Sequence, residues 1–223
     1  MKAAISTTDL DPASLVARVR ASAPIADHNY VADVSTPEPY DVHATSPDHA
    51  YRVVAYDCGE KAGIAKRLAE AGCEVTVVPW DTTAEEALLY EPDGVFFSNG
   101  PGDPATADGP VTLLREVLQA DIPYFGICFG NQLFGRALGF GTYKLKFGHR
   151  GINQPVMDLR TRKVEITAQN HGFAVDAPLD RAVETPWGSA RVSHLCLNDD
   201  VVEGLELTAP DGRVLGFSVQ YHP

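Results

Sequence analysis

Cys128 is the residue in this sequence whose surroundings best suit covalent chemistry. It lies in the pentapeptide Gly-Ile-Cys-Phe-Gly at 126–130, between an apolar segment (122–128) and a helix-like segment (129–139). Strand, tight turn and helix in this order are the context of a nucleophile elbow, in which flanking glycines permit the turn and the nucleophile holds a strained backbone. A helix N-terminus also favours the thiolate. A structural cysteine in a glycine-rich turn is the alternative.

A second loop, SNGPGDP at 98–104, ends the apolar segment that precedes the one leading to Cys128. Loops at the carboxyl ends of neighbouring parallel strands meet over one crevice. This loop can therefore present backbone N–H groups to an oxyanion, together with the N–H of Phe129. An ordinary turn is the alternative, and the lack of a GxxxxGK[ST] pattern argues against a phosphate loop.

His222 is the candidate general base, because it ends the final apolar segment, SVQYHP at 218–223. A strand that ends there delivers an imidazole to the same carboxyl edge as the elbow. His149 and His171 have no partner at metal-ligand spacing, so no metal site is predicted. The other cysteines, Cys58, Cys73 and Cys196, are interpreted as small core residues.

The elements that must position these residues alternate along the chain. Apolar segments predict strands at 51–56, 73–79, 94–98 and 122–128, and periodic segments predict helices at 62–72, 83–90, 109–120 and 129–139. We expect Asp81 or Thr82 to cap the helix at 83–90. The alternation predicts an α/β fold, an open and mostly parallel sheet flanked by helices. Short β-rich segments follow and predict an added antiparallel region, at 142–148, 163–169, 190–197, 202–207 and 214–220.

Residues 1–50 differ from the rest of the chain. Asp11 and Pro12 suit the start of a short helix, and a stretch rich in Pro, Asp and Ser follows (24–50). We interpret this stretch as a partly extended linker or arm. The expected division is therefore 1–50 and 51–223.

Composition excludes several classes of protein. The formal net charge is -12, which disfavours nucleic acid and anionic membranes as partners. No apolar run is long enough to cross a bilayer, and the opening residues lack the apolar core of a secretory signal. The four cysteines are widely spaced, which is typical of a reduced, cytoplasmic protein.

The motifs GICFGNQ, SNGPGDP and the closing YHP resemble the triad, or class I, glutamine amidotransferases, in which Cys, His and Glu hydrolyse glutamine. Two further stretches, KFGHRGINQPV (146–156) and ITAQNHGFAVD (166–176), resemble the small chains of carbamoyl-phosphate synthases rather than the anthranilate, GMP or CTP synthase relatives. The opening stretch resembles the end of that family's N-terminal domain and its linker. The resemblance covers nearly the whole chain and implies a flavodoxin-like sheet.

The resemblance also implies a role for each matching residue. Cys128 matches the nucleophile, His222 the general base, and the backbone N–H groups of Gly100 and Phe129 the oxyanion hole. L-Glutamine would be held by Gly100, Gly102, Phe129, Gln132, Asn170, Gly172 and Phe173. The implied partner is a large synthase subunit that uses bicarbonate, ATP and Mg²⁺ to make carbamoyl phosphate for arginine and pyrimidine synthesis. No cofactor is expected in this chain itself.

The sequence departs from the family pattern in three places. Asn131 stands where many relatives have His, and we expect altered helix packing there rather than lost activity. The family's acid is a Glu directly after His-Pro, whereas this sequence ends at Pro223. Met1 matches an internal stretch of the family. We therefore expect a fragment that lacks most of the N-terminal domain and the C-terminal end.

Three alternative functions stay open. The chain would be an amidotransferase that serves another synthase, a non-catalytic regulatory or interaction subunit, or a cysteine hydrolase or peptidase on a related fold. The KFGHRGINQPV match argues against the first, and only the missing Glu favours the second.

Overall fold

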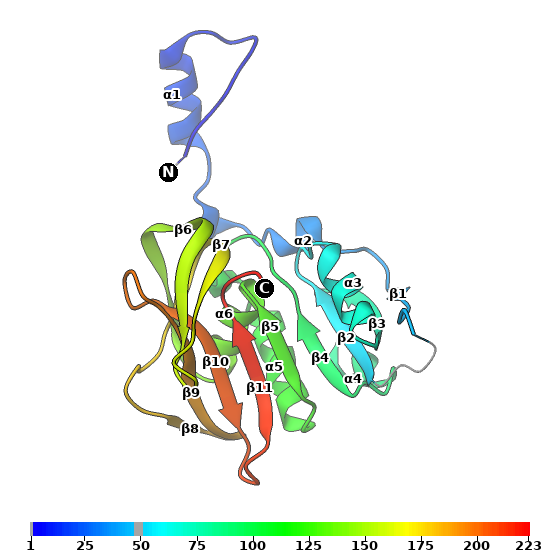
Figure 1. Ribbon diagram of the computed structural model, residues 1–223. Coiled ribbons are helices and arrows are strands. Elements are labelled where there is room, and N and C mark those ends of the chain that lie inside the picture. The colour runs from blue at the N-terminus through cyan, green and yellow to red at the C-terminus, as the bar shows by residue number, and fades with distance from the viewer. Residues whose placement is uncertain (1, 47–50) are drawn as a thin grey trace.

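One continuous sheet organises the chain, for which the computed structural model describes residues 2–46 and 51–223. Its strand order is β1-β3-β2-β4-β5-β11-β10-β9-β6-β7, with β8 paired to β9 (Figure 1). The strands are β1 (Tyr40–Val42), β2 (Tyr51–Asp57), β3 (Cys73–Pro79), β4 (Gly94–Phe97), β5 (Tyr124–Ile127), β6 (Gly141–Asp158), β7 (Val164–Asp176), β8 (Val183–Thr185), β9 (Gly188–Cys196), β10 (Val202–Thr208) and β11 (Val214–Val219). The helices are α1 (Pro12–Ala21), α2 (Val31–Val34), α3 (Gly63–Glu70), α4 (Ala84–Leu88), α5 (Asp108–Gln119) and α6 (Phe129–Ala137), with 3-10 turns at Ile25–Asp27 and Pro104–Thr106.

The centre of the sheet is parallel. Strands β3, β2, β4, β5 and β11 pair in parallel, and the remaining pairings are antiparallel. This confirms the predicted α/β fold with an added antiparallel region. In the register of β5 and β11, Ile127 lies opposite Val219. The two strands therefore end at the same level, which brings the residues that follow them to one edge of the sheet.

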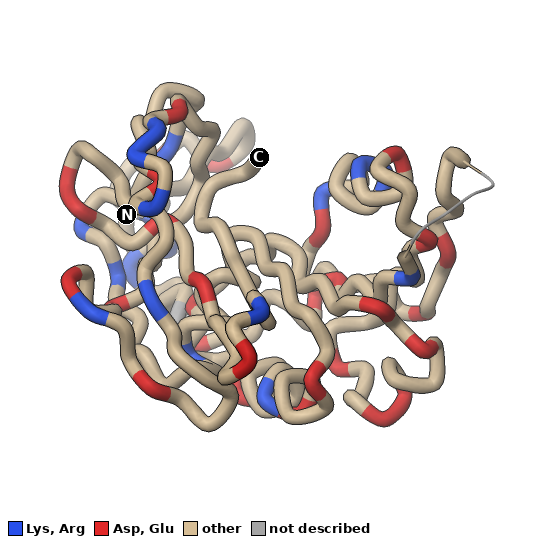
Figure 2. Tube along the Cα trace, turned by 60° about the horizontal axis from the view of Figure 1, so that its bottom comes forward, with Lys and Arg blue, Asp and Glu red and all other residues tan. Residues whose placement is uncertain are grey.

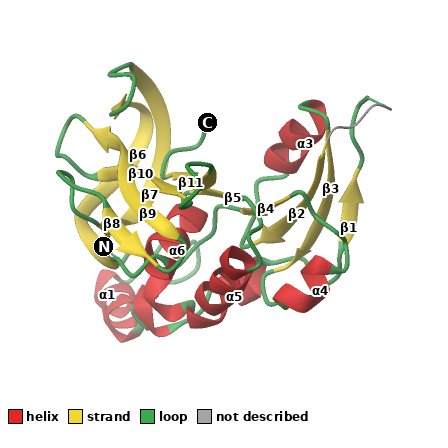
Figure 3. Cartoon of the chain, turned by 90° about the horizontal axis from the view of Figure 1, so that it is seen from below, coloured by secondary structure: helices red, strands yellow, loops and turns green. Residues whose placement is uncertain are grey.

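Helices cover both faces of the parallel strands, as Figure 3 shows. On one face α4, α5 and α6 pack over Tyr56 and Phe97, and on the other α3 packs over Ala55 and Phe96. Alternate residues of each strand point to opposite faces, so a strand covered on both sides must be apolar throughout. This is why four of the parallel strands, β2, β3, β4 and β5, were recognisable as short apolar runs.

Two local predictions need correction. Thr83, and neither Asp81 nor Thr82, caps α4: its hydroxyl accepts from the N–H of Glu86, whose carboxylate accepts in return from the N–H of Thr83. This reciprocal pair is a capping box. The second correction concerns β6 and β7, which form one long hairpin. The predicted strands at 142–148 and 163–169 cover only parts of them.

The N-terminal part divides in two. Helix α1 begins at Pro12 with Asp11 as its cap, as predicted, and it buries no residue and extends away from the sheet (Figure 1). Part of the predicted linker belongs to the folded domain instead: β1 pairs with β3 in the sheet, and Val31 of α2 is buried in the core. The expected boundary after residue 50 falls at residues 47–50, outside the described residues, and stays a prediction.

Acidic residues are distributed over both halves of the molecule (Figure 2), in keeping with the net charge of -12. Within residues 2–46 and 51–223, no helix is long and apolar enough to span a membrane.

Candidate active site

The backbone at Cys128 has the strained conformation that the elbow motif predicts. Cys128 lies between β5 and α6 with φ 55° and ψ -96°, outside the regions that non-glycine residues prefer. A Cβ at Gly126 would collide with the hydroxyl of Tyr124, and one at Gly130 with the carbonyl oxygen of Phe97. Both glycines are therefore required by close packing around the turn.

A cavity of about 500 Å³ opens above this elbow. It gathers nearly all the residues that the sequence singled out, although they come from four separate parts of the chain: the loop at 98–104, the elbow with α6, β7 and the segment after β11. Those that line it are Gly100, Gly102, Cys128, Gln132, Asn170, Gly172, Phe173 and His222. Phe129 is the exception: its side chain is buried beneath the cavity, and only its backbone belongs to the elbow. The structure thus brings the predicted site together, and the roles of its residues stay predictions.

Three cationic side chains outside the predicted site also line the cavity: Lys61, Lys144 and Arg150. Lys61 follows the carboxyl end of β2, so the strand-end rule that found the other loops was sufficient to find it. Lys144 and Arg150 lie on β6, which was only partly predicted as a strand. Their positive charge suits a cavity for an anionic group.

The two loops expected to form an oxyanion hole are joined by hydrogen bonds. The N–H of Gly130 donates to the carbonyl of Ser98 at 3.2 Å, which ties the loop at 98–104 to the elbow. A Cβ at Gly100 would collide with the carbonyl oxygen of Cys58, so the loop can approach only with glycine there. Phe129 is the first residue of α6, where backbone N–H groups have no partner within the helix.

Burial decides the ionisation of Cys128. It raises the pKa of this thiol to about 12, and the opposing effects of the Phe129 N–H, Lys61 and the Gln220 side chain are smaller. The helix N-terminus does stabilise the thiolate, as expected. This stabilisation is smaller than the free-energy cost of removing the thiolate charge from water. In the free chain Cys128 is therefore a neutral thiol.

His222 is also neutral. Burial, together with the smaller effects of the nearby Lys61 and His171, lowers its pKa to about 4. Its backbone N–H donates to the carbonyl of Ala168 on β7 at 2.9 Å, which fixes the residue beside the cavity. Its Nδ1 is buried and has no hydrogen-bond partner among the described residues. Nε2 is left as the ring nitrogen that can face the cavity.

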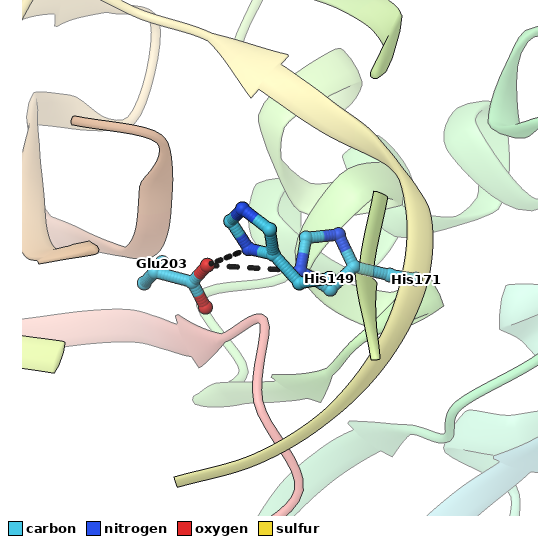
Figure 4. A group of neighbouring side chains, drawn as sticks. All are labelled: His149, His171 and Glu203. Atoms are coloured by element: carbon cyan, nitrogen blue, oxygen red, sulfur yellow. Dashed lines mark hydrogen bonds and ion pairs between the residues drawn. The ribbon is translucent and has the colours of Figure 1, made fainter. Parts of the chain in front are cut away.

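Next to the cavity lies a cluster that sequence spacing did not reveal: His149, His171 and Glu203 (Figure 4). Nδ1 of His149 is 3.1 Å from Glu203, and its Nε2 is 2.8 Å from Asp199. His171 contacts the carbonyl of Phe173 at 2.9 Å through Nδ1.

Gln169 completes this network, because its carboxamide oxygen lies 2.8 Å from His149 and 3.0 Å from His171. The hydrogen bond to Glu203 is the main cause that raises the pKa of His149 to about 9, so this ring is cationic at neutral pH. Hydrogen bonds and ion pairs between protein groups therefore account for the cluster. The prediction that the chain binds no metal stays a prediction.

Comparison with known proteins assigns the family. The profile of the family Glutamine amidotransferase class-I matches residues 54–223. The chain belongs to this family. Within it, this amidotransferase chain is similar to two proteins called carbamoyl phosphate synthase small chain. The one from Streptomyces avermitilis is 58% identical over 213 residues, and the one from Mycobacterium tuberculosis is 53% identical over 215.

Both alignments cover 96% of this amidotransferase chain but only 55% and 56% of the relatives. The chain therefore spans about half the length of the curated relatives it matches. Among solved structures, a glutamine amidotransferase from Thermotoga maritima has a TM-score of 0.55 at 19% identity, covering 78% of this chain and 76% of that one. A glutamine amidotransferase from Methylobacillus flagellatus has a TM-score of 0.54 at 16% identity, covering 77% and 68%. At these identities the likeness shows the fold alone, and it agrees with the predicted class I amidotransferase-like sheet.

Proposed function

We propose that this chain is the glutamine-hydrolysing part of a carbamoyl phosphate synthase small chain, releasing ammonia from L-glutamine through a thioester on Cys128. The observation that carries the proposal is that Cys128, on its strained elbow, shares one cavity with His222 and with the loop at Gly100. The names of the relatives support the choice of synthase.

The first step is acylation. Because both groups are neutral, the proton of the Cys128 thiol passes to His222 as the sulfur attacks the side-chain amide carbon of glutamine. Starting from a neutral pair avoids a buried charge before substrate arrives. The backbone N–H groups of Gly100 and Phe129 hold the oxyanion, and one such donor contributes about 2.7–4 kcal/mol in the transition state.

The second step is release. His222 returns its proton to the departing nitrogen, so ammonia leaves and a thioester stays on Cys128. A water molecule then gives up a proton to His222 and attacks the thioester carbon. Glutamate is released, and the proton on His222 restores the thiol.

The cavity walls suit the other end of glutamine. Gln132 uses its Nε2 to donate to the carbonyl of Phe173 and to Gln220, which leaves its carboxamide oxygen to accept from the α-ammonium group. Lys144 and Arg150 add positive charge toward the α-carboxylate. The remaining predicted contacts, from backbone and small side chains, are Gly100, Gly102, Asn170, Gly172 and Phe173.

The proposed partner is a large synthase subunit that receives the ammonia and uses it with bicarbonate and ATP. ATP and Mg²⁺ would bind to that subunit, and carbamoyl phosphate would feed arginine and pyrimidine synthesis. We place the complex in the cytoplasm, with neither nucleic acid nor a membrane as its partner.

The test is covalent labelling of the chain with a chloroketone analogue of glutamine, together with an assay for ammonia from free glutamine. We expect labelling at Cys128 that excess glutamine prevents, and ammonia release that Cys128→Ser abolishes. Cys73→Ser is the matched control, because Cys73 lies outside the cavity and should leave both results unchanged. Absence of labelling would favour a non-catalytic subunit, and turnover of peptides in place of glutamine would favour a peptidase. Ammonia release without co-purification of a large ATP-using subunit would favour another synthase.

A further inference from the structure

Gln220 is a fully buried polar side chain beside the nucleophile. It follows Val219, whose carbonyl oxygen accepts from the N–H of Cys128 at 2.8 Å. Its own backbone N–H donates to the carbonyl of Glu203 at 2.8 Å, so its position in the core is fixed from both sides. None of the family motifs assigns a role to this residue.

The orientation of the Gln220 carboxamide follows from its neighbours. Nε2 of Gln132 donates to the carbonyl oxygen of Phe173 at 2.9 Å. A carbonyl oxygen can only accept, so this end of Gln132 must be its nitrogen. The same nitrogen lies 3.1 Å from Oε1 of Gln220, which is therefore the oxygen end of that side chain.

A second donor holds the same oxygen. Nδ2 of Asn131 donates to Oε1 of Gln220 at 3.1 Å, while Oδ1 of Asn131 accepts from the hydroxyl of Ser218 at 2.8 Å. All these groups are buried. This accounts for Asn131 in this sequence: it serves as a fixed donor to Gln220.

The other end of Gln220 is left without a partner. Because Oε1 faces two donors, Nε2 points away from them, and it is buried with no hydrogen-bond partner among the described residues. A buried amide N–H without an acceptor costs about 1–3 kcal/mol, so such groups are rare in folded proteins. Cys128 is bonded through its backbone N–H to Val219, the residue before Gln220. Its sulfur is a weak acceptor as a thiol and a strong one as a thiolate. The side chain of Gln220 is indeed among the groups that lower the pKa of Cys128.

We propose that Gln220 is a preorganised donor to the Cys128 sulfur, held by Asn131 and Gln132 so that its amide N–H stabilises the thiolate as it forms. The N–H engages fully only when negative charge develops on the sulfur, during attack and when the thioester breaks down. An interaction that strengthens in the transition state accelerates the reaction. The proposal rests on Cys128 as the nucleophile of the proposed function.

The test is alkylation of Cys128 by iodoacetamide without glutamine, measured on the peptide that contains it by mass spectrometry. Gln220→Glu keeps an oxygen for Asn131 and Gln132 but replaces the donor with a second oxygen. Below the thiol pKa the rate is proportional to the thiolate fraction, so a pKa higher by one unit makes alkylation at a fixed pH of about 9 tenfold slower. We expect a decrease of about tenfold or more. Cys73 in the same sample is the internal reference and should react at an unchanged rate.

Two further variants separate this role from a purely structural one. Gln220→Met has a similar shape and no donor, so it should also slow alkylation, by less than Gln220→Glu because it adds no negative charge. Asn131→Ala removes one anchor yet leaves the donor, so it should lower the melting temperature with a smaller effect on alkylation. If Gln220→Glu and Gln220→Met reduce the melting temperature but alkylate like the wild type, the proposal is overturned. Should Gln220→Glu not fold, Gln220→Met decides.

Alkylation does not depend on glutamine turnover, so the two proposals fail separately. If the variants are alkylated more slowly but the chain releases no ammonia, only the proposed function is contradicted. If ammonia release needs Cys128 but both Gln220 variants are alkylated at the wild-type rate, only the donor role of Gln220 is contradicted.

Discussion

The backbone N–H of Cys128 donates to the carbonyl oxygen of Val219 at 2.8 Å, which fastens the end of β5 to the end of β11. His222 follows three residues later and is fixed in turn by its N–H bond to Ala168. The proposed nucleophile and the proposed base are therefore held by backbone hydrogen bonds at the carboxyl edge of the sheet. Side-chain changes nearby can alter their chemistry without moving them apart.

Cys128→Ser should reduce ammonia release from glutamine on the order of 10³-fold or more, since a serine hydroxyl is a far weaker nucleophile beside this neutral base. In a complex with the proposed large subunit, synthesis from added ammonia should be retained. Measuring synthesis with glutamine and with ammonia separates the two. Equal loss of both would count against the assigned role.

The pH dependence of kcat/KM should report the lowered pKa of His222. This group is a neutral base above a pKa of about 4, whereas an exposed histidine would lose this form below 6.5. We therefore expect kcat/KM for glutamine to change little between pH 7 and about 5 and to decline below that. An acidic midpoint near 6.5 would show that the imidazole is solvated in the working enzyme.

The free energy of unfolding should decrease as pH rises, because folding raises the pKa of His149. Its pKa rises from 6.5 to about 9 on folding, so its contribution is complete below 6.5 and lost as pH rises through 9. The free energy of unfolding, from urea titrations at pH 6.5 and 8, should therefore be lower at pH 8. Glu203→Gln should remove most of this difference and destabilise the chain by on the order of 3–5 kcal/mol at pH 6.5, because it breaks a buried ion pair. An unchanged pH slope in this variant would contradict the pairing.

Gly100→Ala should be destabilising and inactivating at once. The new methyl group would collide with the carbonyl oxygen of Cys58, which costs about 1–3 kcal/mol and displaces the expected oxyanion donor. Ammonia release should then drop by about 10²–10³-fold. Gly109→Ala is the matched control, since nothing lies within 4 Å of a Cβ there. It should leave activity intact and change stability by less than about 1 kcal/mol.

Thr83→Ala should reduce stability by about 1 kcal/mol, because it removes the hydroxyl that caps α4. In a chain of this size the melting temperature should decrease by about 2–4 °C. Thr82→Ala, one residue earlier, should have little effect. If Thr82→Ala lowered the melting temperature and Thr83→Ala did not, Thr82 would be the cap, as predicted from the sequence.

Local signals account for what could be predicted. The elbow at Cys128 and the apolar parallel strands depend on short-range sterics and on burial of both faces of a strand, which leave clear patterns. The capping residue and the length of the β6–β7 hairpin were missed. Several residues near Thr83 suit a cap equally well. The stretch at 149–158 mixes polar and apolar residues, and only His149 and Val156 in it are buried, so it lacks the pattern of a buried strand.

The amino-acid sequence by itself determined the α/β fold, the family and most of the residues that gather at the cavity. Tertiary structure decided what those residues are chemically. The thiol of Cys128 and the ring of His222 are neutral because segments far apart in the chain bury them, and His149 is charged because Glu203 lies against it. An ionisation state depends on burial and on charges summed over the whole fold, and neither is encoded in the spacing of a motif.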